Sequence, residues 1–329
     1  MSGSSQNNYD AVVVGAGPNG LAAAIRLQQA GLSVLLVEGK DSIGGGTRSA
    51  ELTLPGFTHD ICSAIHPLAL ESPFFKTLPL QDFGLEFVYP RIAAAHPFDG
   101  GNAAFLCRSV DETAQSLGLD ENYYRSLIQP RVDQWPDIVE DVLAPLGIPK
   151  NPVAFAKFGI RAVTSAQYLS ERFQTQEARG LLAGMAGHSM QPFTNLTTSA
   201  IALVLMITGH TTGWPFPKGG SHRISDALAA FFRSLGGKIE TNFYVRSMDD
   251  LPHTHAVLFD VTPAQLLRIA GDRFSSLYKH QLKRYRYGMG VFKIDWALDG
   301  PAPFLARGCR EAGTVHLGNT FEEIADAEA

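Results

Sequence analysis

The chain opens with an apolar run that enters a glycine-rich turn and then a helix-like segment. Residues 9–20 read Tyr-Asp-Ala-Val-Val-Val-Gly-Ala-Gly-Pro-Asn-Gly. The β-branched run 10–14 suits a buried parallel strand. Residues 20–30 space their apolar side chains for one buried helix face, and Gly31 is placed to end that helix. The order strand, turn and helix predicts the start of a βαβ unit.

Each residue of the turn has a separate physical role. Gly15 lets the chain bend sharply, Gly17 lets a phosphate group approach the backbone, and Gly20 lets the helix pack on the strand. Pro18 suits the first helical turn, where its missing N–H costs little, and Asn19 lies beside it. Free amides and the positive end of the helix dipole make such a turn an anion site.

A second apolar run, residues 33–37, ends on a single acid, Glu38. The acid stands roughly 20 residues beyond the glycines, where a carboxylate can accept hydrogen bonds from ribose hydroxyls. It would repel a 2′-phosphate, so FAD or NAD is favoured over NADP. Strand, helix and acid together predict a dinucleotide-binding unit rather than a simple tight turn.

The glycines after Glu38 discriminate between FAD and NAD. Residues 39–49 read Gly-Lys-Asp-Ser-Ile-Gly-Gly-Gly-Thr-Arg-Ser. Glycines here let the longer FAD molecule pass close to the backbone, and an arginine can pair with phosphate. Arg48 would equally suit a surface or structural ion pair. We expect FAD contacts from Gly45, Gly46, Thr47 and Arg48.

This second segment resembles a known flavoprotein motif. Residues 38–49 resemble the Glu-x-(Lys/Arg)-x-x-x-Gly-Gly stretch of the phytoene-desaturase and amine-oxidase flavoproteins. Gly44 and Gly45 match the glycine doublet and Lys40 the basic position, whereas Gly46 falls where many relatives carry arginine. Further similar stretches are residues 54–60, 63–67 and 213–221.

Taken together, these motifs resemble the phytoene-dehydrogenase-like NAD(P)/FAD-dependent oxidoreductases, in particular the branch of pyridine nucleotide-disulphide oxidoreductase domain-containing protein 2. The resemblance implies hydride transfer to FAD from a small apolar, carotenoid-like substrate that is dehydrogenated, desaturated or isomerised. Oxygen, a quinone or NAD(P) would then accept the electrons. It also implies backbone contacts to adenine near Val245. Relatives are longer and carry another glycine-rich segment, so we expect the C-terminal part of the fold to be missing here.

Features of the nucleotide domain return after a mostly helical middle. Residues 217–221 lead into an amphipathic helix, and residues 255–261 read as a core strand. We therefore predict an α/β fold in which a discontinuous Rossmann-type FAD-binding domain carries an inserted α+β, largely helical substrate domain. The expected FAD-binding domain covers residues 1–75 and 212–285, and the substrate domain covers residues 76–211 and 286–329.

Two further elements are expected in this second domain. The helical pattern of residues 120–146 contains Pro130 and Pro136, which should break it because proline lacks an N–H group. Apolar and polar residues alternate over residues 287–298, which predicts a half-exposed strand.

Composition limits the remaining possibilities. The chain has 329 residues, 45% of them hydrophobic and 18% charged, which indicates about two folded domains. A net charge of −5 without a basic block argues against nucleic acid as a partner. Three scattered cysteines suggest buried thiols in a reducing compartment, and no residues show metal-ligand spacing. The short polar leader and the lack of a membrane-length apolar run favour a cytoplasmic protein, with peripheral membrane contact and oligomeric state left open.

No catalytic residue can be assigned from the sequence. His59, His66 and His96 stand alone, and isolated histidines are more commonly structural. A flavin carries most of the chemistry itself, so few catalytic side chains are required. The alternatives are a flavin amine oxidase, a plain NAD dehydrogenase, or a non-catalytic remnant or half of a split enzyme that acts through a partner.

Overall fold

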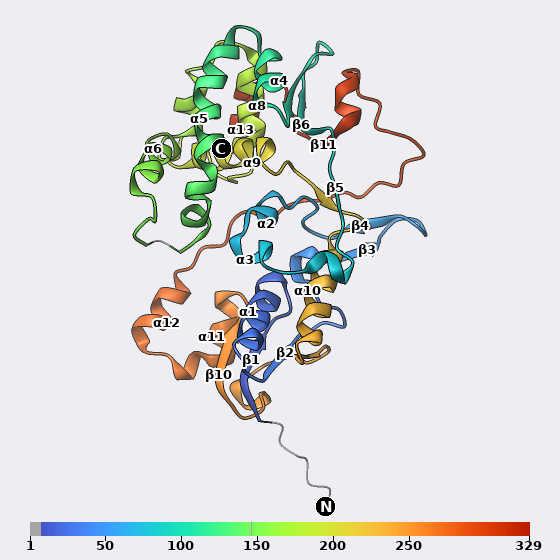
Figure 1. Ribbon diagram of the computed structural model, residues 1–329, viewed down its shortest axis with the longest axis vertical. Coiled ribbons are helices and arrows are strands. Elements are labelled where there is room, and N and C mark those ends of the chain that lie inside the picture. Colours follow the sequence, from blue (N-terminus) through green and yellow to red (C-terminus); the bar gives the residue numbers. More distant parts are fainter. Residues whose placement is uncertain (1–7, 146) are drawn as a thin grey trace, which may run out of the picture. The chain divides into compact units, whose positions relative to one another are not determined.

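The computed structural model describes residues 8–145 and 147–329 and divides the chain into two compact units (Figure 1). Unit 1 holds the residues up to 64, 79–87 and 217–297, and unit 2 holds residues 65–78, 88–216 and 298–329. Residues 286–297 thus lie in unit 1, although the sequence placed them with the second domain. The assignment of FAD binding to one unit and substrate binding to the other stays a prediction.

Unit 1 is built on a four-stranded parallel sheet in the order β10-β1-β2-β9. Its strands are β1 (Tyr9–Val14), β2 (Val34–Val37), β9 (Lys238–Glu240) and β10 (Thr254–Phe259). Its α-helices are α1 (Pro18–Gln29), α10 (His222–Ser234), α11 (Pro263–Ala270) and α12 (Ser276–Lys283). Short β3 (Ser49–Glu51) and β4 (Thr58–Asp60) form an antiparallel pair. The parallel sheet confirms the predicted Rossmann-type α/β fold.

The core of unit 1 explains why these strands form. β1 and β2 are apolar on both faces, and Val12, Val14, Leu35 and Val37 pack in one cluster with Val245. Such two-faced burial is typical of parallel strands covered by helices. Helix α1 buries its apolar face, and this places the turn before it at the carboxyl edge of the sheet.

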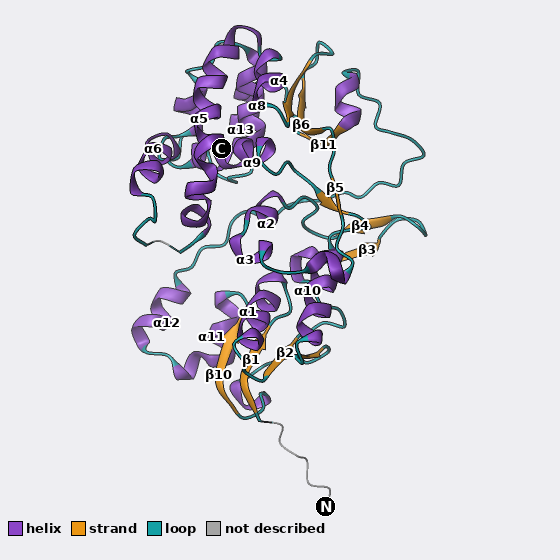
Figure 2. Ribbon diagram, in the orientation of Figure 1, coloured by secondary structure: helices purple, strands orange, loops and turns teal. Residues whose placement is uncertain are grey.

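Unit 2 is α+β and largely helical, as predicted (Figure 2). Its sheet has the order β11-β6-β7, from β6 (Ile92–Pro97), β7 (Ala103–Cys107) and β11 (Ala312–Val315). The longer helices are α5 (Glu121–Leu143), α6 (Pro152–Ala162), α8 (Gln176–Gly187) and α9 (Thr198–His210). The shorter ones are α2 (Pro67–Glu71), α3 (Pro73–Lys76), α4 (Val110–Gln115), α7 (Ala166–Ser170) and α13 (Phe321–Ala327). Two-residue strands β5 (Phe87–Val88) and β8 (Phe216–Pro217) pair with each other.

Two sequence predictions about local structure were wrong. Helix α5 continues through Pro130 and Pro136, because tertiary burial of side chains such as Trp135 outweighs the hydrogen bonds lost at the prolines. Residues 287–298 form no strand, and Phe292 is 89% exposed. In the described part of the chain no neighbouring strand pairs with this segment, and alternation alone does not supply a partner.

Within residues 8–145 and 147–329, none of the helices has the length and apolar character needed to cross a bilayer.

Candidate functional site

The glycine turn after β1 is held by close backbone contacts. Gly15 has φ +105°, and a Cβ atom there would lie 2.4 Å from the carbonyl oxygen of Asp260. A Cβ atom on Gly20 would lie 1.9 Å from the carbonyl oxygen of Gly15. Both distances are far inside van der Waals contact, so any side chain at these positions would force the backbone apart. The chain therefore requires glycine at both positions.

The turn leads into the N-terminus of α1, with Gly17 as the N-cap and Pro18 in the first turn. The Gly20 amide donates to Oδ2 of Asp260 at 2.8 Å. Among the described residues, the amides of Gly17 and Asn19 have no hydrogen-bond acceptor. Free amides at the N-terminus of a helix, together with the helix dipole, are the arrangement that favours an anion.

Glu38 joins this turn to the segment that follows β2. Its Oε2 accepts from the amide of Ala16 at 3.0 Å, and its Oε1 accepts from the amide of Lys40 at 3.0 Å. Each carboxylate oxygen has a second lone pair free for a ligand. The two bonds hold the carboxylate in one orientation, which is what recognition of a ribose diol needs.

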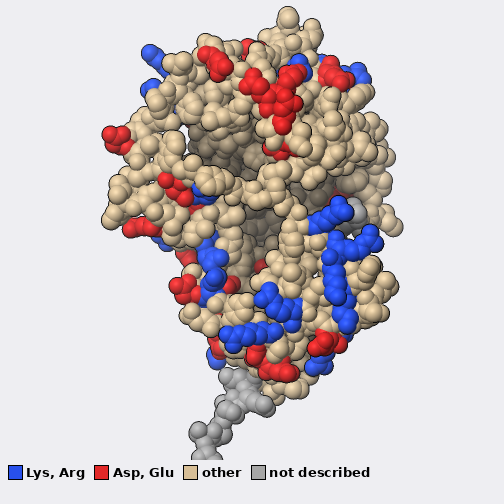
Figure 3. Space-filling model, turned by 180° about the vertical axis from the view of Figure 1, so that it is seen from behind, with Lys and Arg blue, Asp and Glu red and all other residues tan. Residues whose placement is uncertain are grey.

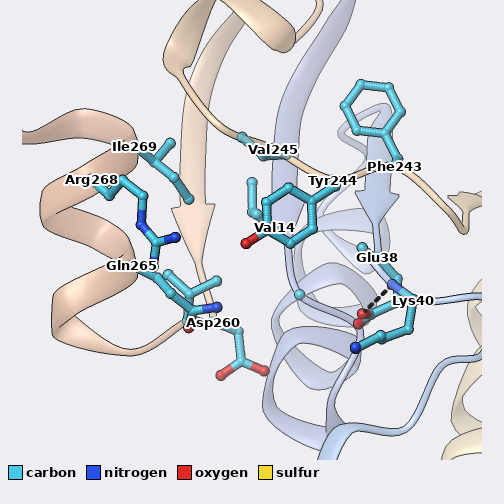
Figure 4. A pocket seen from close by; sticks show the side chains of 13 residues that line it. Val14, Glu38, Lys40, Phe243, Tyr244, Val245, Asp260, Gln265, Arg268 and Ile269 are labelled. Carbon is cyan, nitrogen blue, oxygen red and sulfur yellow. Dashed lines mark hydrogen bonds between the residues drawn. The ribbon is translucent and has the colours of Figure 1, made fainter.

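Glu38 lines a cavity of about 230 Å³ in unit 1 (Figure 4). Tyr244 and Val245 lie on one side of the cavity, and Gln265 and Arg268 reach toward it from α11 (Figure 4). Pockets that enclose drug-sized ligands usually measure about 300–1,000 Å³, so this cavity suits part of a dinucleotide rather than the whole. Its full lining is Val14, Gly15, Glu38, Gly39, Lys40, Phe243, Tyr244, Val245, Asp260, Val261, Gln265, Arg268 and Ile269.

The second glycine segment lies against the first. A Cβ atom on Gly45 would lie 3.1 Å from Cα of Gly17, and the Gly44 amide donates to the Ala16 carbonyl at 2.8 Å. The glycines at 44 and 45 therefore let the two turns approach each other. A Cβ atom on Gly46 would lie no closer than 4.0 Å to a neighbouring atom, Sγ of Cys62.

Thr47 and Arg48 follow directly. The Thr47 side chain is buried, and its hydroxyl donates to the Gly44 carbonyl at 2.8 Å and lies 2.5 Å from Oγ of Ser225. The Arg48 Nε–H group donates to the Gly45 carbonyl at 3.0 Å. Both side chains thus stabilise the second glycine turn.

The structure adds Asp260, which the sequence analysis missed. Asp260 follows β10, and its amide donates to the Val14 carbonyl at 2.8 Å, which places the carboxylate beside the glycine turn. Burial raises the pKa of Asp260 and the nearby Glu38 carboxylate raises it further, while the Gly20 amide opposes both effects. An acid near the end of the predicted core strand 255–261 was the available signal, since parallel strands end at the same edge.

A metal site receives no support from the structure. Across the described residues, no group of three or more His, Cys, Asp or Glu side chains is arranged to hold an ion.

The NAD(P)-binding Rossmann-like domain family matches residues 13–75. A phytoene desaturase (lycopene-forming) of Pseudescherichia vulneris is 29% identical over 265 residues, which cover 72% of this chain and 49% of that protein. Pyridine nucleotide-disulfide oxidoreductase domain-containing protein 2 of Mus musculus is 24% identical, covering 71% of this chain and 47% of its own length.

Over about 70% of its length the chain is therefore similar to phytoene-dehydrogenase-like oxidoreductases. This similarity agrees with the resemblance noted in the motifs after Glu38. The chain spans about half the length of the curated relatives it matches, 49% and 47% for the two named above.

Solved structures share the fold. An oxidoreductase from Methanosarcina mazei aligns with a TM-score of 0.58 at 19% identity, covering 83% of this chain and 64% of that one. A redesigned putrescine oxidase, the A394C-A396T-Q431G triple mutant, aligns with a TM-score of 0.55 at 23% identity, covering 83% and 62%.

Proposed function

We propose that this oxidoreductase binds FAD in unit 1 and dehydrogenates, desaturates or isomerises an apolar, carotenoid-like substrate held by unit 2. The observation that carries the proposal is the convergence of Glu38, the glycine turn and Val245 around one cavity. Three separate chain segments meet there. Glu38 contributes a carboxylate, the glycine turn contributes free amides, and Val245 contributes an apolar surface.

The residues present fit FAD. Glu38 would bind the ribose diol, the amides of Gly17 and Asn19 the pyrophosphate, and Val245 with Tyr244 the adenine ring. We assign the remaining predicted contacts to the second glycine turn and its neighbours, Lys40, Gly45, Gly46, Thr47 and Arg48. Bound FAD would supply the hydride acceptor, and the protein would supply orientation and exclusion of water. Oxygen, a quinone or NAD(P) would reoxidise it.

Flavin binding can be tested with a matched pair of variants. The purified chain, refolded with excess FAD if necessary, should show a flavin absorption spectrum and release FAD on denaturation. Glu38→Ala should weaken FAD binding roughly 10–100-fold, because it removes charge-assisted hydrogen bonds. Asp41→Asn, a nearby exposed acid that does not line the cavity, should bind FAD like the wild type. A chain that never retains flavin would end the proposal.

The substrate class needs its own experiment. Anaerobic addition of phytoene in detergent micelles should bleach the flavin absorbance of FAD-loaded protein. Bleaching by amines, with peroxide formed in air, would instead favour the amine-oxidase alternative. Flavin retention without bleaching by either would favour a binding role that needs a partner chain.

A further inference from the structure

A small cavity in unit 2 lies between helices α5 and α6, which pack side by side (Figure 1). The cavity measures about 260 Å³. Residues three and four apart share one face of a helix, and the lining follows this spacing on both helices. Three of the six lining residues are basic and none is acidic. The lining consists of Pro130, Arg131 and Gln134 from α5 and of Lys157, Ile160 and Arg161 from α6.

The three cations of this cavity lack acidic partners. Within the described part of the chain, Arg131, Lys157 and Arg161 take part in none of the ion pairs of unit 2. The cations that do form ion pairs there are Lys76, Arg91, Arg125, Lys150 and Arg179. Acidic residues outnumber basic ones in unit 2 as a whole. The cavity therefore concentrates positive charge in a unit whose overall balance is negative.

Arg131 is partly buried and carries its charge into the protein. Its Nη1 group donates to the Leu127 carbonyl, while its buried Nε atom has no acceptor among the described residues. Burial lowers the pKa of Arg131, and the charge of Arg161 lowers it further. Arginine nevertheless stays protonated in proteins. A partly buried cation beside like charges is costly unless an anion compensates it.

The hydroxyl of Tyr123 lies near the same cations. It is buried and, over residues 8–145 and 147–329, has no hydrogen-bond partner. Burial raises the pKa of Tyr123, whereas the charges of Arg161, Arg172 and Arg131 oppose this rise. Buried polar atoms in folded proteins nearly always have partners. Two buried donors without acceptors, beside cations without counter-ions, indicate that an anion belongs here.

Charge and shape favour phosphate as that anion. The guanidinium group of arginine matches the oxygens of carboxylate and of phosphate. A phosphate monoester carries a charge of about −1.5 to −2 near pH 7, whereas a carboxylate carries only one negative charge. A single carboxylate would leave two of the three cations uncompensated. The cavity is several times larger than the roughly 30 Å³ that one water molecule occupies in the liquid, so a tetrahedral anion fits.

We propose that the cavity between α5 and α6 binds a phosphate group through Arg131, Lys157 and Arg161. This site goes beyond the proposed function, because it is built from unit 2 alone and involves no residue of the FAD cavity. Free phosphate and the headgroup of a lipid share this chemistry. Ile160 lines the cavity and is 69% exposed, so an apolar group joined to the phosphate would meet an apolar surface there.

Inorganic phosphate is the first probe, measured by titration calorimetry of the full chain at pH 7 and constant ionic strength. The wild type should bind phosphate. Lys157→Gln and Arg161→Gln should each weaken binding roughly 10-fold or more, because each removes a charge-assisted hydrogen bond. Lys150→Gln is the matched control. It removes the same charge as Lys157→Gln, but Lys150 pairs with Glu140 and does not line the cavity, so phosphate affinity should stay unchanged.

Urea unfolding gives a second measure of the same site. Phosphate stabilises many proteins by exclusion from their surface, and this general effect should be equal in all variants. Binding to the folded state adds a further stabilisation. The wild type and Lys150→Gln should therefore gain more stability from phosphate than Lys157→Gln and Arg161→Gln do. An equal gain in all four proteins would contradict the site.

Vesicles distinguish the two sources of phosphate. Phosphatidylcholine vesicles with and without phosphatidic acid are mixed with the full chain and sedimented. Sedimentation that requires phosphatidic acid and falls in Lys157→Gln and Arg161→Gln would identify a lipid headgroup, whereas calorimetric binding without sedimentation would identify free phosphate. Binding of neither probe, or equal binding by the wild type and both variants, would overturn the proposal. FAD binding should be unchanged in both variants, so failure of this site and failure of the proposed function are separate results.

Discussion

Unit 1 and unit 2 use their glycines in different ways. In unit 1, Gly15 and Gly20 lie against backbone carbonyl oxygens, and Gly45 lies against another glycine. In unit 2, Gly180 and Gly184 lie inside a helix and face histidine rings. Backbone cannot move aside locally, whereas a side chain can rotate. The turn of unit 1 should therefore tolerate less change than these helical glycines of unit 2.

The two units also differ in their balance of charged residues. Unit 1 carries 15 basic and 14 acidic residues, whereas unit 2 carries 12 and 18. Basic side chains gather over unit 1 on the face shown in Figure 3. A nearly neutral unit suits an anionic dinucleotide, because fewer acids repel its phosphates.

The largest effect is expected in the turn of unit 1. Gly20→Ala places a methyl group on the carbonyl oxygen of Gly15 and should destabilise the protein by more than about 3 kcal/mol. Chemical denaturation measures this change. Gly31→Asn is the matched control, because Asn tolerates its positive φ and nothing lies within 4 Å of the added Cβ atom. Equal stability of the two variants would contradict the close approach of Gly20 to the Gly15 carbonyl oxygen.

A pH effect should arise from unit 2. The pKa of His316 is about 3 in the folded state against an ordinary 6.5, so the unfolded chain binds more protons between these values. Stability should therefore fall as pH drops below 6.5, by up to about 1.4 kcal/mol per pH unit. His316→Gln should flatten this slope in urea unfolding between pH 7 and 4, whereas His280→Gln, at an exposed histidine of unit 1, should leave it unchanged. If the free energy of unfolding changed with pH at the same rate in the wild type, His316→Gln and His280→Gln, the burial of the His316 ring would be contradicted.

A smaller effect is expected from Gly184→Ala. Its methyl group would meet the His316 ring, which can shift, so the cost should be about 1–3 kcal/mol. The hydrogen bond between Nε2 of His188 and Nε2 of His316 should be lost, as read from the histidine NMR spectrum. Gly187→Ala, where the added atom meets only an ordinary contact at 3.7 Å, should be neutral or slightly stabilising because alanine favours helix. If Gly184→Ala destabilised the protein more than Gly20→Ala, the helical glycine of unit 2 would be the less tolerant position.

The smallest effect is expected at Asp260. Asp260→Asn keeps an oxygen for the Gly20 amide, so stability at pH 7 should change by less than about 1 kcal/mol. The raised pKa of Asp260 means that the folded state binds more protons just above pH 3.8, so wild-type stability should fall as pH rises through this window. The variant should lose that dependence and bind FAD slightly more tightly. Weaker FAD binding would show that the carboxylate itself supports the cofactor.

The sequence alone determined the parts that depend on neighbours along the chain. Strand β1, the glycine turn, α1 and β2 with Glu38 were all predicted, because their roles follow from spacing within about one βαβ unit. Tertiary structure decided what depends on distant segments. It carried α5 through two prolines, left residues 287–298 without a strand, and brought Asp260 to Gly20 across 240 residues. Likewise the pairing of His188 with His316 spans 128 residues. Local sequence patterns report the periodicity of apolar residues and the conformational freedom of the backbone. Which side chains become buried, and which distant residues come into contact, is decided only when the chain packs.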